Sequence, residues 1–175
     1  MSYFENMQYP EPRYHGDKGE VSASFRSADT PPEVSSPGGS TSYLATQEST
    51  GGEFGLYKGV LGPRSAGAKE HFHRAMSESF YVLSGELELY DGKKWVTGRE
   101  GDFLYVPAGG LHAFKNTTDD PVSMLMLFAP GAPREDYFER VAEMSQRGPD
   151  ELKEFRVRHD SYFVEDFDFG AGPAQ

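Results

Sequence analysis

The side chains that could do chemistry gather in the segment HFHRAMSESF and in one histidine further along the chain. Residues two apart in a β-strand point to the same face, so His71 and His73 project together. Two imidazoles that converge from one strand are the start of a metal site. Glu78 follows the short break RAMS and could enter from the next strand, and His112 follows the turn PAGG, where another strand should begin. These positions could meet inside one barrel, although each alone is more typical of a solvated polar side chain.

The sequence from Tyr43 to Pro130 predicts the strands that would hold these residues. Short apolar runs rich in valine, leucine and aromatic residues alternate there with turn residues such as DGK and PAGG. The runs that fit a strand are YLAT, FGLYKGVL, SFYVLS, ELELY, KKWVT, DFLYVP, HAFKN and VSMLMLF. Many short strands at close spacing predict an all-β sandwich or barrel.

The segments on either side of this core differ from it in composition. Residues 1–42 are dominated by proline, glycine, serine and charge, and predict a flexible N-terminal arm; an arm that wraps a partner subunit or covers a pocket is the alternative. After Pro130, APREDYFERVAEMSQRG has an acidic first turn, apolar residues at helical spacing and a closing glycine, and PDELKEFRVRHD predicts a second short helix. We therefore expect an arm (1–42), a barrel (43–130) and a helical C-terminal extension (131–175).

The composition argues against several classes of function. Seventeen Lys and Arg against 28 Asp and Glu give a net charge of −11, which disfavours binding to a phosphate backbone. The chain has no cysteine, which removes disulfides, thiol catalysis and thiolate metal ligands together. The N-terminus has no apolar run of signal-peptide length, and no segment approaches the roughly 20 apolar residues of a membrane span. We expect a cytoplasmic protein that binds neither nucleic acid nor membrane.

Two blocks of residues carry a resemblance to a known family. HFHRAMSESFYVLSG reads H-x-H-x4-E-x6-G, and GDFLYVPAGGLHAFKN reads G-x5-P-x-G-x2-H-x3-N. The blocks resemble the two signature motifs of the cupin superfamily, and the 15 residues between them match the spacing of its small single-domain, quercetinase-like (type 2) members. Ser65 stands where the first motif usually opens with glycine, with Gly67 nearby. The resemblance covers roughly residues 43 to 130.

The resemblance implies a double-stranded β-helix, the jelly-roll cupin barrel, and the helical patterns after Pro130 add one or two short C-terminal helices to it. It also implies one divalent transition metal held by His71, His73, Glu78 and His112. Three imidazoles and one carboxylate suit Fe, Mn, Ni, Co, Cu or Zn, and ligand type alone does not choose among these metals. In cupin dioxygenases that resemble quercetinase, the motif glutamate is also thought to take the substrate's proton, so Glu78 is the candidate catalytic base.

Strand parity indicates which side chains could line the pocket. Lys69 shares a face with the first two histidines and could offer a cation to an anionic substrate; a solvated strand-end lysine is the alternative. Phe80 and Phe114 share the faces of the glutamate and of the third histidine, and they either give apolar walls to a small organic substrate or fill the barrel. Asn116 is expected to fix a turn through backbone hydrogen bonds rather than to bind the metal.

Three functions stay open at this level. The first is a metal-dependent oxidoreductase of the dioxygenase type that acts on a small aromatic or enolic compound. The second is a non-redox isomerase or polyketide-type cyclase in which the metal polarises a carbonyl, and the third is a small-molecule-binding cupin without turnover. Because unpaired sheet edges otherwise invite aggregation, we also expect a homodimer.

Overall fold

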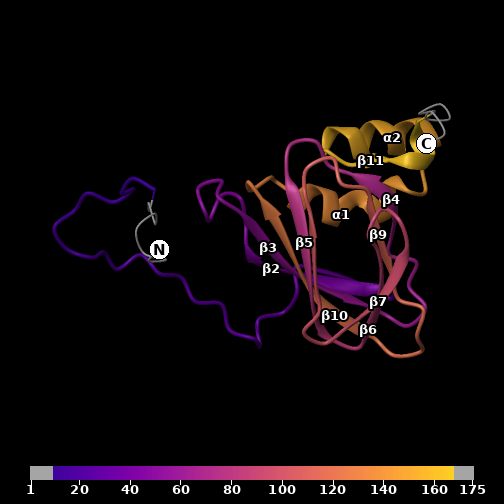
Figure 1. Cartoon of the computed structure of the whole chain (residues 1–175), viewed down its shortest axis with the longest axis horizontal. Coiled ribbons are helices and arrows are strands. Elements are labelled where there is room, and N and C mark those ends of the chain that lie inside the picture. Colours follow the sequence, from indigo (N-terminus) through magenta and orange to yellow (C-terminus); the bar gives the residue numbers. More distant parts are fainter. Residues whose placement is uncertain (1–9, 168–175) are drawn as a thin grey trace, which may run out of the picture.

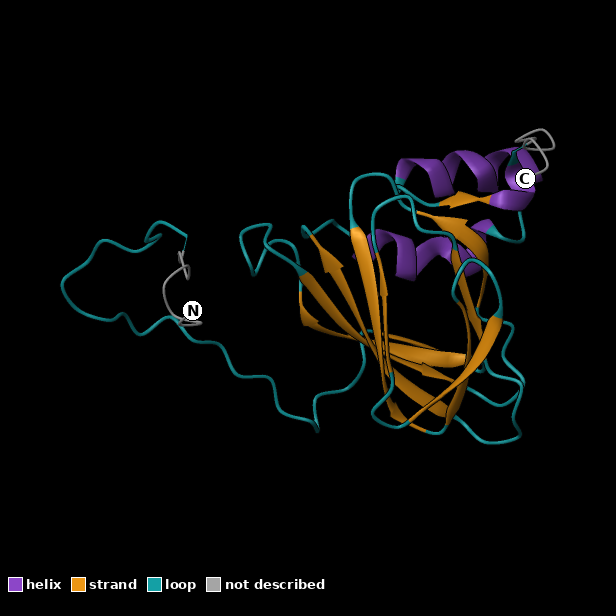
Figure 2. Cartoon of the chain, in the orientation of Figure 1, coloured by secondary structure: helices purple, strands orange, loops and turns teal. Residues whose placement is uncertain are grey.

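Strands dominate the computed structural model, which describes residues 10–167 (Figures 1 and 2). The strands are β1 (Val34–Ser36), β2 (Gly39–Ala45), β3 (Gly55–Leu61), β4 (Ala68–Phe72), β5 (Ser77–Ser84), β6 (Glu86–Tyr90), β7 (Trp95–Arg99), β8 (Phe103–Val106), β9 (His112–Lys115), β10 (Val122–Ala129) and β11 (Tyr162–Phe163). The helices are α1 (Glu135–Met144), α2 (Pro149–Arg158) and the short 3-10 helix η1 (Val164–Asp166). Each apolar run predicted as a strand coincides with one, and both predicted helices are present. Among the described residues, no helix has the length and apolar character needed to cross a bilayer.

The strands form two antiparallel sheets that together make a barrel (Figure 2). One sheet has the order β1-β2-β3-β10-β5-β8, and the other has the order β11-β4-β9-β6-β7. Strand β10 lies between β3 and β5 and alternates strictly between buried and partly buried residues, so Val122, Met124, Met126 and Phe128 all point into the core. This arrangement confirms the all-β double-stranded β-helix.

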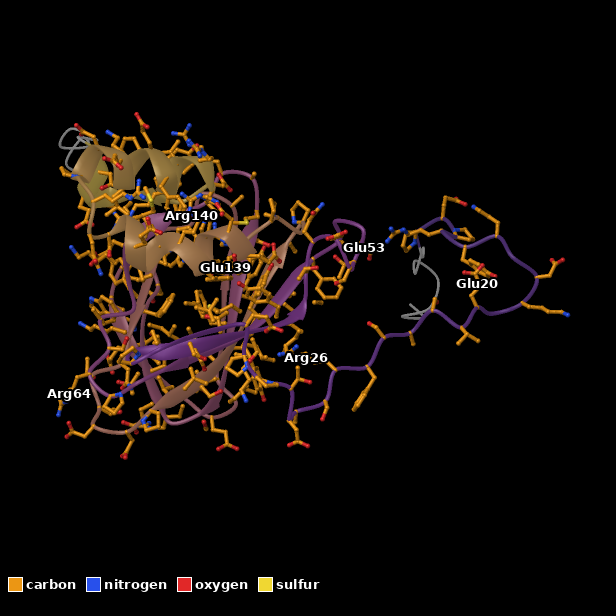
Figure 3. All side chains as sticks on the ribbon, turned by 180° about the vertical axis from the view of Figure 1, so that it is seen from behind. Glu20, Arg26, Glu53, Arg64, Glu139 and Arg140 are labelled. Atoms are coloured by element: carbon orange, nitrogen blue, oxygen red, sulfur yellow. The ribbon has the colours of Figure 1, made fainter. Side chains whose placement is uncertain are left out.

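Helix α1 closes the core against β2 and β3. The ring of Phe138 lies 5.0 Å from that of Tyr57, which is fully buried and donates a hydrogen bond of 2.6 Å to Glu135. Tyr43 donates one of 3.2 Å to Glu139, which Figure 3 labels on the helix. The C-terminal extension is therefore packed on the barrel through both aromatic and polar contacts.

The structure places the ends of the barrel differently from the predicted boundaries. The hairpin of β1 and β2 lies largely within the predicted arm 1–42, and β2 pairs with β3 as part of the six-stranded sheet. Backbone hydrogen bonds add this polar hairpin to the sheet, and composition does not reveal them. Before Val34, the described chain runs away from the barrel (Figures 1 and 3). Residues 1–9 of the arm and 168–175 of the extension lie outside the described residues.

Candidate metal centre

Four side chains from the two sheets converge in the barrel. His71, His73, Glu78 and His112 each offer one ligand atom, and these atoms all lie within 4.8 Å of one another. The four residues are 4%, 2%, 3% and 0% exposed, respectively. The structure therefore brings together the four residues that the sequence motifs single out.

The strand pairing explains why these residues meet. Strands β4 and β9 are neighbours, and His71 is paired directly with His112. His73 follows the end of β4, and Glu78 comes from β5 in the other sheet. The His71 ring lies 4.2 Å from the His112 ring and 5.1 Å from the His73 ring, measured between centroids. Because the cluster joins the two sheets, its geometry depends on the packing of the whole barrel.

The three imidazoles are all oriented by backbone carbonyls. Nδ1 of His71 donates to the carbonyl oxygen of Lys69 at 2.8 Å, and Nδ1 of His112 donates to that of Gly110 at 3.0 Å. Nδ1 of His73 donates to the carbonyl oxygen of Asp160 at 2.5 Å. A carbonyl oxygen only accepts, so each Nδ1 carries a proton and each Nε2 is left to face the cluster. This is the orientation in which metal-binding histidines are commonly held.

Glu78 lies between two of the imidazoles. Its Oε2 is 2.8 Å from Nε2 of His112 and 3.0 Å from Nε2 of His73. Burial alone would raise the pKa of Glu78, but the hydrogen bonds from the two histidines and the charge interactions with them together outweigh burial and hold the pKa well below its ordinary value. Burial lowers the pKa of His71. Burial also opposes the charged form of His112, but the hydrogen bond to Glu78, the negative charge of Glu78 and the hydrogen bond to Gly110 together outweigh burial and raise the pKa of His112. The site therefore holds an ionised carboxylate and an imidazole that favours its charged form.

The donors of the cluster fit a divalent cation. Three Nε2 lone pairs and a carboxylate repel one another unless positive charge lies between them. Protons on the imidazoles can supply this charge, and a divalent ion can replace those protons while taking three nitrogens and one oxygen as ligands. The set suits a transition metal and does not select which one.

The structure does not bring Lys69 to the cluster. Its ammonium group is 2.6 Å from a carboxylate oxygen of Glu165, and its side chain is 66% exposed. The pairing of β4 with β9 shifts register between Ala68 and His71, so the simple alternation assumed for this strand does not hold. The prediction that Lys69 offers a cation at the site is therefore corrected to a solvated lysine in a surface ion pair.

Of the two predicted phenylalanines, Phe80 lies beside the cluster, and Phe114 contacts Phe80. The ring of Phe80 is fully buried, 5.8 Å from the His112 ring and 5.4 Å from the Phe114 ring. Both residues also belong to or pack against the hydrophobic core, so they fill the barrel while bordering the site. Asn116 fixes turns, as predicted, because its side-chain amide donates to two backbone carbonyls and accepts from Thr118.

The sequence did not reveal that the C-terminal extension contacts the cluster. Besides the Asp160 carbonyl, the Phe163 ring stacks on His71, with centroids 4.7 Å apart and planes 10° apart. The buried side chain of Arg134 donates to the hydroxyl of Ser161 at 3.2 Å. The apolar pair YF indicates a buried strand, but nothing in its spacing identifies the histidine that it covers.

Comparisons with known proteins agree with this geometry. Residues 59–128 match the family described as cupin domain. Quercetin 2,3-dioxygenase of Bacillus subtilis (strain 168) is 31% identical over 72 residues, which are 41% of this chain and 21% of the relative. The chain thus spans much less than the full length of that enzyme.

Solved structures show the same fold at low sequence identity. KdgF from Halomonas sp. superimposes with a TM-score of 0.54 at 18% identity, covering 63% of this chain and 96% of that protein. A Klebsiella pneumoniae subsp. pneumoniae MGH 78578 protein with a double-stranded β-helix domain gives a TM-score of 0.52 at 20% identity, covering 63% and 93%. At these identities the likeness shows the fold alone.

Proposed function

The chain contains a domain of the cupin superfamily, and from that premise we propose that it is a metal-dependent oxidoreductase of the dioxygenase type. One divalent transition metal would be held by His71, His73, Glu78 and His112, and the substrate would be a small aromatic or enolic compound. A redox-active metal bound there would polarise a substrate oxygen and exchange electrons between substrate and dioxygen. The likeness of the matched region to quercetin 2,3-dioxygenase supports this class.

The observation that carries the proposal is the apolar lining around the imidazoles. Aromatic rings lie beside each histidine: Phe163 is 4.7 Å from His71, and Phe128 is 6.1 Å from His73. Phe80 completes the set beside the third histidine. Such walls favour a flat apolar substrate with one or two oxygen donors over a phosphorylated sugar.

Glu78 would have two roles in the proposed reaction. Its low pKa keeps the carboxylate ionised at neutral pH, which is the form that ligates a metal. The same low pKa makes the carboxylate a weak base while the two histidines donate to it, and a metal that took both Nε2 atoms would remove those hydrogen bonds and strengthen the base. Two imidazole Nε2 atoms within 3.0 Å fix its position. A substrate hydroxyl that reached this carboxylate would lose its proton to it and become the better metal ligand.

A cupin that binds a metal or small molecule without turnover is the second candidate. The specific observation in its favour is that all four ligand residues are at most 4% exposed. Catalytic metal sites usually keep a position open to substrate, whereas structural sites are closed. Turnover would require the side chains that cover the cluster to move.

Metal content and oxygen uptake measured on the same preparations test the proposal. Wild-type protein and His112→Ala would be analysed by plasma mass spectrometry, with His15→Ala as a control because His15 is an exposed histidine outside the cluster. We expect near-stoichiometric Fe, Mn, Ni, Co or Cu in the wild type and in His15→Ala, and loss of the metal in His112→Ala. Consumption of dioxygen with a flavonol or another enolic compound should follow the metal.

Other outcomes of this experiment separate the alternatives. Full activity with zinc on a carbonyl substrate, without oxygen uptake, would favour a non-redox isomerase or cyclase. Tight ligand binding with no product would favour the binding cupin. A wild type that takes up no added divalent metal would overturn metal binding itself.

We also propose a homodimer. Tyr81, Phe103 and Tyr105 are 43%, 62% and 59% exposed on the neighbouring strands β5 and β8, and β8 is an edge of its sheet. An exposed aromatic group at a sheet edge supports association with a second copy. Light scattering should give a dimer that Tyr105→Asp weakens; a monomer of 19.5 kDa would contradict it.

The acidic charge and lack of cysteine support a cytoplasmic protein that binds no nucleic acid.

A further inference from the structure

The last strand of the C-terminal extension is part of the sheet that carries the histidines. Strand β11 pairs antiparallel with β4, so that Phe163 lies opposite His71 and Tyr162 lies opposite Phe72. The extension thus reaches the cluster after two helices that are not part of the barrel (Figure 1). The two rings of β11 have different partners: Phe163 stacks on His71, whereas Tyr162 stacks on Phe72 at 5.2 Å.

Asp160 binds the segment around His73 through both its backbone carbonyl and its side-chain carboxylate. Its carbonyl oxygen accepts from Nδ1 of His73, and its carboxylate accepts from the backbone N–H groups of Arg74 at 3.0 Å and Ala75 at 2.8 Å. Its φ of 53° is in the left-handed region, which aspartate tolerates better than most residues. The carboxylate therefore fixes the position of the carbonyl that orients the imidazole.

Charged groups anchor this segment to the start of α1, where Arg134 lies, and to α2. The Arg134 guanidinium donates to the carbonyl oxygen of His159 at 2.5 Å and to the Ser161 hydroxyl at 3.2 Å, while being only 4% exposed. The Arg156 guanidinium lies 3.8 Å from the Phe163 ring centroid. Phe163 itself is 3% exposed, so its ring is held in place by groups on several elements.

We propose that residues 159–163 are a positioning element of the metal centre. The Asp160 carbonyl holds His73 with its Nδ1 protonated and its Nε2 facing the cluster, and Phe163 fixes the ring plane of His71. Neither residue is a metal ligand; each acts through a histidine. This inference rests on the proposed metal binding, and it predicts that the affinity for the metal depends on a strand outside the matched residues 59–128.

Two aromatic substitutions in β11 form a matched test. Phe163→Ala removes the ring over His71, and Tyr162→Ala removes the neighbouring ring over Phe72, so both shorten one aromatic residue of the same two-residue strand. The affinity for cobalt(II) would be measured in the full chain by competition with a chromophoric chelator, and the cobalt absorption spectrum would report the ligand geometry. We expect Phe163→Ala to weaken cobalt binding by about tenfold or more and to change the spectrum, as loss of groups that orient ligands does. Phe163→Leu, which keeps an apolar side chain at this position, should recover part of the affinity.

The outcomes distinguish this inference from the proposed function. A wild type that binds cobalt with an affinity that Phe163→Ala leaves unchanged overturns the positioning role alone. An equal loss in Tyr162→Ala and Phe163→Ala, with both folded by circular dichroism, also overturns it, because the loss then reflects general loosening of β11. A wild type that binds no cobalt overturns the proposed metal site and, with it, this inference.

The hydrogen bond from Nδ1 of His73 to the Asp160 carbonyl gives a readout that needs no metal. Asp160→Gly keeps a residue that suits the left-handed conformation but removes the carboxylate that fixes the carbonyl. In metal-free wild-type protein the Nδ1 proton of His73 should exchange slowly with water, because it is donated to the Asp160 carbonyl, and it should exchange faster in Asp160→Gly. An unchanged exchange rate would count against the role of Asp160.

Discussion

Replacing Asn116 by alanine removes a buried hydrogen-bonding group at the end of β9. Its Nδ2 donates to the carbonyls of Gly62 at 2.9 Å and Asp120 at 2.8 Å. Its Oδ1 accepts from the backbone N–H of Thr118 at 2.9 Å and from the Thr118 hydroxyl at 2.8 Å. Because Asn116 is only 1% exposed, water does not replace these bonds while the fold is intact.

The expected loss of stability follows from these contacts. Four hydrogen bonds of normal length at a net value of about 1 kcal/mol each amount to about 4 kcal/mol. The Thr118 hydroxyl keeps its other bond, to the Asp120 carbonyl, which reduces the cost. We therefore expect Asn116→Ala to lower the free energy of unfolding by about 3 kcal/mol and to leave the metal content of the folded protein unchanged.

Urea unfolding followed by tryptophan fluorescence would measure this loss. Trp95 is the chain's one tryptophan and lies on β7, so its emission reports the barrel. Thr118→Val is the matched control, because it removes the hydroxyl that is shared between Asn116 and the Asp120 carbonyl while keeping the other three bonds of Asn116, and it should cost about 1 to 2 kcal/mol. A variant Asn116→Ala that is nearly as stable as the wild type but has lost its metal would refute the reasoning and place Asn116 at the metal site.

Three further predictions concern the ion pair of Glu165, two glycines and the metal. The hydrogen bond from Lys69 holds the pKa of Glu165 below its ordinary value of 4.5. The ion pair therefore stabilises the fold fully above about pH 4.5, and this stabilisation is lost as the pH falls through the lower pKa of the folded state. Thermal melts should show Glu165→Gln less stable than wild type by under about 1 kcal/mol at neutral pH, since the pair is partly exposed, and equal to it in acid; a gap that widens in acid would contradict this. Gly67 has φ of 59°, and a Cβ there would lie 2.0 Å from a carbonyl oxygen, whereas Gly101 has φ of 92° and open space around it. Urea titrations should therefore show that Gly67→Ala lowers the free energy of unfolding by more than about 2 kcal/mol and that Gly101→Ala lowers it by about 1 kcal/mol. Added cobalt(II) at about 100 times its dissociation constant should stabilise the wild type by about 2.7 kcal/mol, reversibly by chelator, and leave the melting of His112→Ala unchanged.

The barrel could be predicted because its strands carry local signals. In β10, the alternation of Val122, Met124, Met126 and Phe128 with more exposed residues has the period of a strand, and the core takes every second side chain. The hairpin of β6 and β7 turns at an Asp-Gly pair, which is a strong short-range signal. The ligand set could be predicted for another reason. Its residue types and spacing match a known pattern, in which the pairing of the strands brings the ligand residues together.

The remaining features depend on contacts between distant parts of the chain. Alternation alone places Lys69 on the face of the histidines with a solvated lysine as the alternative, and a register shift in β4 that no residue type indicates directs its side chain to Glu165 at the surface. The approach of Asp160 and Phe163 to the cluster depends on how two helices carry the chain back to β4, which periodicity within either helix does not specify. Sequence patterns identify which groups can bind a metal, but the elements that orient those groups are selected by tertiary packing.

The residues that contact the cluster come from both sheets and from the C-terminal extension, and metal binding is therefore coupled to the packing of these parts. The ligands come from both sheets, so the site exists only once the sheets have packed, and a metal that binds only the folded state stabilises that packing by its own binding free energy. The extension adds a further link, because Asp160 and Phe163 contact two of the ligand histidines without being ligands. If docking of the extension tightens the metal by some factor, the metal must favour the docked extension by the same factor, since binding equilibria are reciprocal. The extension is then a part of the metal centre in energetic terms, although the residues that match the family end at position 128.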